Sequence, residues 1–109
     1  MKIKKFLLVF ILPFLFNSQT SFADEAKMIK GLEIFNETAG CAACHVLKAA
    51  GSEGNIGPNL DTVEGLNYDS VMDIVTHGLG VMPAFGEDEI LTKEEIDIVS
   101  FYVANSVGK

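Results

Sequence analysis

The apolar residues of this 109-residue chain recur three to four positions apart in three stretches, which is the spacing of one helix face. The stretches run from 24 to about 36, from 68 to 77 and onward from Thr92. No clear strand pattern, repeat or second domain is evident, so the pattern predicts one all-α domain. The residues that define the three faces are Met28, Leu32 and Phe35; Val71, Ile74 and Val75; and Ile96, Val99 and Val103.

The first two helices carry signals beyond their periodicity. Gly31 lies one turn before Phe35, and because a glycine costs a helix about 1 kcal/mol relative to alanine, we expect another helix to approach closely there. A neutral glycine in a marginal helix is the alternative. Asn67 or Asp69 can cap the second helix, and Gly78 suits the position after its last turn.

The third helix has the clearest start. Thr92 and Glu95 have the spacing of a capping box, in which each side chain accepts a hydrogen bond from the other's backbone. Leu91 and Ile96 have the spacing of the hydrophobic staple that accompanies it. We expect residues 105–109 to fray.

The first 23 residues have the pattern of a secretory signal peptide. Three lysines among the first five residues precede an apolar run from 6 to 16, and Ser21 and Ala23 are small residues where a signal peptidase cleaves. A membrane anchor is the alternative, but the run is well short of the roughly 20 apolar residues that span a bilayer. We predict cleavage after Ala23, a periplasmic domain of residues 24–109, and no stable membrane insertion afterwards.

The predicted mature chain is strongly acidic. All 15 Asp and Glu residues lie beyond Ala23, against five lysines and no arginine, so the net charge of residues 24–109 is −10. This charge argues against nucleic acid as a partner. It favours encounter with a basic patch on a protein partner, and it is equally well explained by solubility.

The motif Cys41-Ala42-Ala43-Cys44-His45 follows the first predicted helix. C-x-x-C-H is the spacing used for covalent attachment of a c-type haem. Two thiols a short turn apart can each form a thioether to one vinyl group of the same porphyrin. His45 then lies under the ring and can ligate the iron from one face.

Three other uses of the cysteine pair fit the sequence less well than haem attachment. A structural disulfide leaves His45 unexplained. A thioredoxin-type redox pair belongs in a βαβ setting, and the chain shows no such pattern. A zinc site needs four ligands, and only His45 and His77 are available to complete it.

A glycine-rich loop, which we expect to be flexible, extends from 49 to 58 and leads into Gly57-Pro58-Asn59-Leu60. No strand precedes it, so its glycines do not make a phosphate cradle. The fixed φ of Pro58 can hold its carbonyl in one direction, which makes this carbonyl a candidate acceptor for the second ring N–H of His45. An ordinary turn explains the tetrapeptide equally well.

Met82 precedes Pro83, and a residue before proline is disfavoured in helical geometry. We therefore expect Met82 on an extended loop, where its thioether can ligate the second face of the iron. Methionine is the usual partner of histidine in electron-transfer cytochromes. A core methionine is the alternative reading. His77, the only other histidine, is the rival ligand, but its place at a helix end suggests the surface.

Taken in order, these pieces resemble a small class I c-type cytochrome of the cytochrome c6, c551 and c553 types. The resemblance covers nearly all of residues 24–109. The matching segments are Gly31-Leu32-Glu33-Ile34-Phe35, the C-A-A-C-H motif, Gly57-Pro58-Asn59-Leu60, Met82-Pro83-Ala84-Phe85-Gly86, and Leu91-Thr92-Lys93-Glu94-Glu95-Ile96 leading into Tyr102-Val103.

The resemblance implies an all-α cytochrome c fold, with three to four helices wrapped around one covalently bound haem (heme c). It implies that the first and last helices cross at Gly31, Phe35 and Tyr102. The haem contacts that it implies are thioethers from Cys41 and Cys44, iron ligation by His45 and Met82, a hydrogen bond from His45 to Pro58, and packing by Leu60.

The chain departs from many members of this family in one respect. They place Trp or Arg near the haem propionates, and this chain has neither residue. Lys48, Tyr68 and Asn59 are candidate donors instead.

The resemblance implies an electron-transfer protein rather than an enzyme. It would carry one electron between redox partner proteins in the periplasm and would transform no small-molecule substrate. A dedicated cytochrome subunit of a periplasmic dehydrogenase or oxidase is the alternative. A haem enzyme or gas sensor is a third possibility, and it requires that Met82 leave the iron open.

Overall fold

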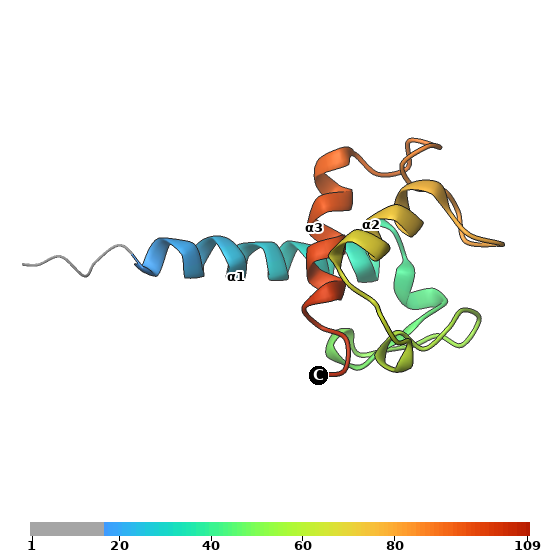
Figure 1. Cartoon of the computed structure of the whole chain (residues 1–109), viewed down its shortest axis with the longest axis horizontal. Coiled ribbons are helices and arrows are strands. Elements are labelled where there is room, and N and C mark those ends of the chain that lie inside the picture. Colours follow the sequence, from blue (N-terminus) through green and yellow to red (C-terminus); the bar gives the residue numbers. More distant parts are fainter. Residues whose placement is uncertain (1–16) are drawn as a thin grey trace, which may run out of the picture.

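The computed structural model describes residues 17–109, and within this range the chain folds into three α-helices joined by long loops (Figure 1). Short turns and a two-stranded ladder supplement the helices. The predicted all-α class is confirmed. The helices and strands are α1 (Asn17–Glu33), β1 (Val46–Leu47), β2 (Ser52–Glu53), α2 (Tyr68–His77) and α3 (Lys93–Ala104); the shorter turns are a π-helical turn at Ile34–Thr38 and 3-10 turns at Cys41–Ala43, Lys48–Ala50 and Leu60–Thr62.

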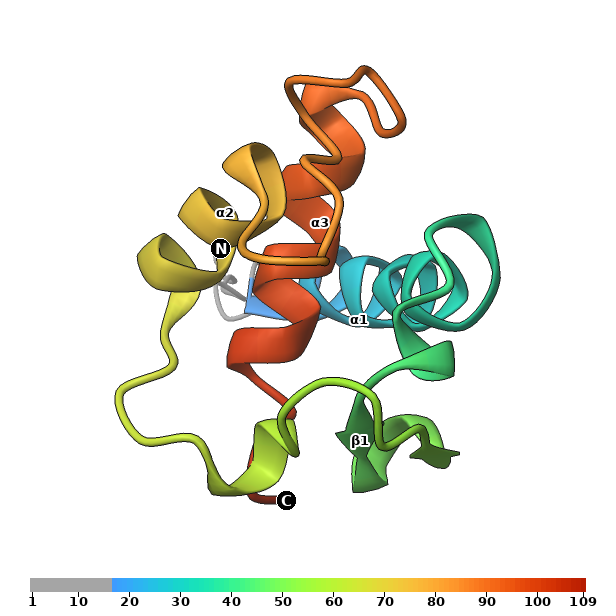
Figure 2. The ribbon, with the colours of Figure 1, turned by 90° about the vertical axis from the view of Figure 1, so that its right-hand side faces the viewer.

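Helix α3 packs against both α1 and α2, and α1 crosses it at Gly31 (Figure 2). A Cβ atom added to Gly31 would lie 2.3 Å from the Cβ atom of Tyr102, so only glycine permits this approach. One turn later the rings of Phe35 and Tyr102 meet at a tilt of 56°, with their centroids 6.1 Å apart. The predicted crossing is confirmed, and the reading of Gly31 as a neutral residue is wrong.

Helix α1 begins earlier than we predicted. It starts at Asn17 and continues through the expected cleavage site after Ala23, and its first turns project from the body of the protein in Figure 1. Most of the predicted signal peptide, residues 1–16, lies outside the described range. No helix among the described residues is both long enough and apolar enough to cross a bilayer.

The predicted caps of α2 and α3 are present. The Asn67 side chain accepts a hydrogen bond from the Ser70 backbone at 2.9 Å, which selects Asn67 over Asp69 as the cap. At α3, the Glu95 N–H donates to Thr92 Oγ1 at 3.1 Å and the Thr92 N–H donates to Glu95 Oε1 at 2.9 Å. These local hydrogen bonds start each helix where the sequence indicated.

Two segments that we expected to be irregular form ordered contacts. Strands β1 and β2 pair antiparallel, with Leu47 opposite Ser52, so the expectation of no strand was wrong. The C-terminal tail does not fray, because the Gly108 N–H donates to Asp61 Oδ1 at 2.8 Å and Ser106 is buried. Neither the short ladder nor the contact of Asp61 with the tail produces a periodic pattern in the sequence.

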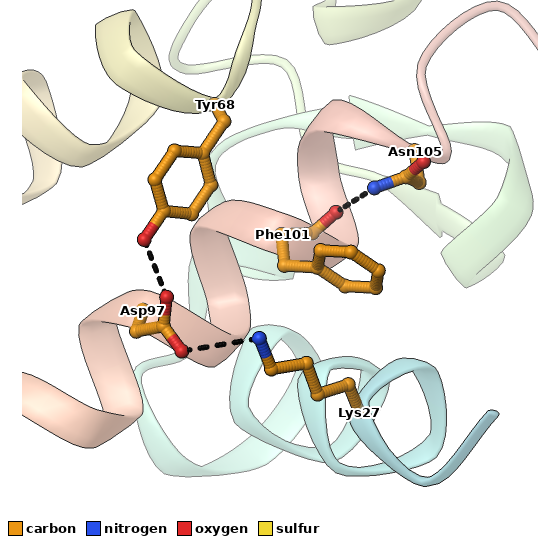
Figure 3. Close-up of polar contacts among 5 residues, drawn as sticks. All are labelled: Lys27, Tyr68, Asp97, Phe101 and Asn105. Carbon is orange, nitrogen blue, oxygen red and sulfur yellow. Dashed lines mark hydrogen bonds and ion pairs between the residues drawn. The ribbon is translucent and has the colours of Figure 1, made fainter. Parts of the chain in front are cut away.

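A polar network joins the three helices (Figure 3). The Tyr68 hydroxyl donates to the Asp97 carboxylate, and Lys27 Nζ lies 3.3 Å from the second oxygen of that carboxylate. Lys27 Nζ also lies 4.8 Å from the centroid of the Phe101 ring. The hydrogen bond lowers the pKa of Asp97 and raises the pKa of Tyr68 to about 12. At neutral pH, Asp97 is therefore ionised and Tyr68 keeps the proton that it donates.

Candidate cofactor site

A cavity of about 510 Å³ lies among α2, α3 and the loops before and after α2. Its wall is almost entirely apolar, and no acidic side chain, lysine or arginine is among the described residues that line it. Phe35, Val75, Phe85 and Val99 belong both to this wall and to the buried core. All six residues that the sequence assigned to a cofactor also line it: Cys41, Cys44, His45, Pro58, Leu60 and Met82.

A single 3-10 turn places both thiols and the imidazole on one wall of this cavity. The N–H groups of Cys44 and His45 both donate to the Cys41 carbonyl, at 3.1 and 3.0 Å. The turn therefore closes at His45, immediately after the second cysteine. This is the local geometry that the C-x-x-C-H spacing requires.

The ring of His45 is oriented by the segment that follows the glycine-rich loop. Its Nδ1–H donates to the Pro58 carbonyl at 2.8 Å, as we predicted. A Cβ atom on Gly57 would lie 2.6 Å from His45 Cε1, so this position accommodates only glycine. The Gly57 N–H in turn donates to the Cys44 carbonyl at 2.7 Å. With Nδ1 carrying the proton, Nε2 keeps the lone pair that can bind a metal.

Met82 lies on a tight turn between α2 and α3, outside any helix, as predicted. Its backbone exchanges two hydrogen bonds with Leu79, at 3.0 and 3.2 Å. The Phe85 N–H donates to the Val75 carbonyl at 2.9 Å and ties this loop to α2. The Met82 side chain is half-buried and lines the same cavity as His45.

The rival ligand, His77, is directed elsewhere. It does not line the cavity, and its Nδ1 lies 2.6 Å from Glu87 Oε2 at the protein surface. The hydrogen bond to Glu87 raises the pKa of His77. A bis-histidine site built from His45 and His77 is therefore not supported.

The other uses of the cysteine pair also lose support. Cys41 and Cys44 are free thiols. Burial raises the pKa of Cys41 to about 11, which is the opposite of the activation that a redox-active cysteine needs. Within the described part of the chain, no three His, Cys, Asp or Glu side chains are grouped to hold a metal ion, so a zinc site is not formed.

The candidate donors to haem propionates do not reach the cavity. The Tyr68 hydroxyl is bonded to Asp97, and the Asn59 side chain accepts the Asp61 N–H at 2.9 Å to cap the turn at Leu60–Thr62. The Lys48 side chain is exposed and does not line the cavity. None of the three residues lines the cavity, and their assignment to the propionates stays a prediction.

Exposed apolar residues at the cavity mouth were not predicted from the sequence. Ile56, Leu79 and Val81 line the cavity and yet are 71, 69 and 93% exposed. Each lies in a loop beside glycine, next to one of the chemical motifs. Apolar residues in such loops are the signal that could have identified them.

The residues of the cavity fit a haem. A large apolar wall suits a flat apolar macrocycle, and two free thiols on one side can form the thioethers. An imidazole with a free Nε2 and a methionine thioether form the uncharged pair of ligands that is typical of electron-transfer cytochromes.

Comparison with known proteins gives the same result. The family model described as Cytochrome C oxidase, cbb3-type, subunit III matches residues 26–103. Among solved structures, the c-type cytochrome SorU from Sinorhizobium meliloti is 45% identical, with a TM-score of 0.70; the match covers 78% of this chain and 95% of that one. The comparison with curated proteins gave no match. The chain therefore belongs to this family of c-type cytochromes, which implies covalent haem c and electron transfer, and it has the cytochrome c fold.

Proposed function

We propose that the chain carries one electron between periplasmic redox partners, with haem bound through Cys41 and Cys44 and iron ligated by His45 and Met82. The observation that carries this proposal is the meeting of all four side chains in one apolar cavity. The 2.8 Å hydrogen bond from His45 to Pro58 supports the role of His45 in particular, because ligating histidines usually donate their second N–H in this way.

The bound haem would supply an iron that changes reversibly between Fe(II) and Fe(III). The residues of the chain keep its surroundings constant during that change. Pro58 and Gly57 fix the His45 ring, while the bonds of Met82 to Leu79 fix the backbone that carries the thioether. The apolar wall excludes water from the iron. A site with little freedom to rearrange suits rapid electron exchange.

Export of the chain is part of the proposal. Residues 1–23 would direct it to the periplasm and be removed, leaving Asp24 as the first residue. Mass spectrometry of the exported protein tests this directly. We expect the mass of residues 24–109 plus one haem, and a protein that retained its first 23 residues would contradict it.

An absorption spectrum of both oxidation states is the main test. After periplasmic expression together with haem-maturation factors, we expect a six-coordinate low-spin spectrum with the band of methionine–iron ligation. Extraction with acidified organic solvent should leave the colour on the protein. A colourless preparation, or pigment that is freely extracted, contradicts the proposal.

The variant Met82→Ala tests the second ligand. We expect haem to remain attached while the sixth position opens, so that the reduced variant binds carbon monoxide and the unchanged protein does not. Met72→Ala is the matched control, because Met72 lies on α2 and does not line this cavity. Unchanged ligation in Met82→Ala would show that another residue binds the iron. Rapid binding of carbon monoxide to the unchanged protein would instead favour a haem enzyme or gas sensor.

A dedicated subunit of a periplasmic dehydrogenase or oxidase is a second candidate function. Exposed Ile56, Leu79 and Val81 at the cavity mouth favour it, because apolar side chains grouped at a surface suit a lasting interface. The family description, which names an oxidase subunit, points the same way. Co-purification of a partner from native cells at high salt would favour the subunit, and release at moderate salt would favour the free carrier.

A further inference from the structure

Ser52 on β2 lies directly behind His45. The residue is only 7% exposed, and its hydroxyl both accepts and donates hydrogen bonds. Ser52 Oγ accepts the Leu47 N–H at 2.9 Å and donates to the His45 carbonyl at 2.9 Å. One hydroxyl therefore joins the backbone on both sides of Val46, immediately after the histidine.

The surroundings leave these backbone groups few other partners. Leu47 is completely buried, and its N–H donates to the Ser52 hydroxyl. The backbone of His45 is held at its N–H by Cys41 and at its carbonyl by Ser52. The ring is then held by Pro58. Removing the hydroxyl would free the carbonyl side of His45 and leave its ring attached to a looser backbone.

We propose that Ser52 is a positioning residue for His45, whose hydroxyl fixes the backbone that aligns the imidazole Nδ1–H with the Pro58 carbonyl. The inference rests on the proposed function, since it takes His45 as an iron ligand. Ser52 would act on the iron only through His45.

The direction of the effect follows from the chemistry of the imidazole. A ligating histidine that donates its second N–H to an acceptor is a more basic ligand. A more basic ligand favours the oxidised iron and lowers the reduction potential. Loosening the His45–Pro58 hydrogen bond should therefore raise the potential and let the Nδ1 proton exchange faster with solvent.

Ser100 supplies a matched control. It is 0% exposed, lies on α3, does not line the cavity, and its hydroxyl has no hydrogen-bond partner in the structure. Ser100→Ala therefore removes a buried serine hydroxyl that holds no backbone group. Ser52→Ala makes the same chemical change where the hydroxyl holds His45.

The test compares the haem-loaded unchanged protein, Ser52→Ala and Ser100→Ala. Reduction potentials are measured by spectroelectrochemical titration, and exchange of the His45 Nδ1 proton is measured by NMR. We expect a higher potential and faster exchange only in Ser52→Ala. Equal potentials and exchange rates in the two variants would overturn the inference, because a purely structural hydroxyl alters folding stability alone.

If Ser52→Ala does not accumulate as folded protein, Ser52→Thr takes its place because it keeps the hydroxyl. A folded Ser52→Thr protein with the potential and exchange rate of the unchanged protein supports the inference, and displaced values overturn it. The outcome for the proposed function is separate. A wild-type protein without covalent haem would overturn both proposals. A haem-loaded protein in which Ser52→Ala changes neither the potential nor the exchange rate would overturn only the role of Ser52.

Discussion

At the scale of single residues, His45 is held by groups from three separate turns of the chain. Its backbone bonds to Cys41 and Ser52, and its ring bonds to Pro58. Residue type and spacing made Cys41 and His45 candidates for the cofactor site. The sequence offered the Pro58 carbonyl as a possible acceptor for His45, with an ordinary turn as an equal alternative. Ser52 could not be assigned, because the role of its hydroxyl depends on a two-residue ladder that gives no periodic signal.

Asp61 is a second residue of this kind. Its carboxylate accepts the Lys48 N–H and the Gly108 N–H, each at 2.8 Å, and so joins the turn next to Leu60 to the C-terminal tail. These backbone hydrogen bonds lower the pKa of Asp61 below its ordinary value of 3.8. Neither partner could be inferred from the sequence, since both are backbone groups of segments that only the fold brings together.

The depressed pKa of Asp61 predicts a pH-dependent contribution to stability. Because the folded pKa lies below the unfolded one, the contribution is complete above the unfolded value of 3.8 and is lost as the pH falls through the folded pKa. We expect Asp61→Asn to lower the denaturant midpoint at pH 7 and to have a smaller effect near pH 2. Asp88→Asn is the control, because it makes the same chemical change at an exposed position. A deficit for Asp61→Asn that is equal at both pH values would contradict this account.

At the scale of elements, the sequence predicted the starts of α2 and α3 better than the limits of α1, which begins at Asn17 and not at residue 24. The capping boxes at Asn67 and Thr92 lie where α2 and α3 begin, because capping depends on residues three positions apart. The end of α1 was predicted less well. The helix passes at Ile34 into a π-helical turn, in which the Ala39 N–H donates to the Ile34 carbonyl at 2.8 Å. This wider turn contains the buried Ile34 and Phe35, and the change from an α-helical to a π-helical turn has no signal in the apolar spacing.

The crossing of α1 and α3 predicts the effect of Gly31→Ala. Alanine favours an isolated helix by about 1 kcal/mol over glycine. Its Cβ atom, however, would lie 2.3 Å from the Cβ of Tyr102, and the helices must separate to admit it. Overpacking of a tight contact costs typically about 1–3 kcal/mol, which exceeds or cancels the helix gain, so we expect a net loss of up to about 2 kcal/mol in unfolding free energy. Denaturant unfolding measures it, with the exposed Ile29→Ala on the same helix as control. A stabilised Gly31→Ala would show that the crossing is less tight than described.

The network of Tyr68, Asp97 and Lys27 predicts unequal contributions from its two contacts. We expect Tyr68→Phe to cost about 1 kcal/mol, since a hydrogen bond to a charged group is partly screened at a half-exposed site. Lys27→Met should cost less, because the ion pair is exposed and typically contributes only about 0–1 kcal/mol. Thermal unfolding of both single variants and the double variant measures the two terms. A larger loss of stability for Lys27→Met than for Tyr68→Phe would show that the ion pair contributes more than the hydrogen bond.

At the scale of the whole molecule, the cofactor cavity is part of the core. Phe35, Val75 and Val99 face both, so the protein core is completed only by what occupies the cavity. The predicted mature chain has 86 residues, and a chain of that size buries only about 60–65% of its unfolded surface. Sequence motifs therefore predicted this fold well, because they mark the contacts of the group around which the chain folds. The exposed apolar mouth was not predicted, since exposure depends on how the loops close.

The acidic surface predicts how electron exchange depends on salt. Residues 24–109 carry a net charge of −10, and the acidic run from Glu87 to Glu89 is exposed on the loop that contains Met82. Because opposite charges steer encounter and salt screens them, reduction of a cationic ruthenium complex should slow by at least about threefold between 10 mM and 500 mM salt. Electron exchange with anionic ferricyanide should accelerate over the same range. Stopped-flow absorbance of the haem measures both rates on one preparation, so the two reagents control for each other. If the rate of electron transfer to the ruthenium complex did not depend on salt, electrons would leave the protein far from the acidic loop. The negative charge would then contribute to solubility and not to partner recognition.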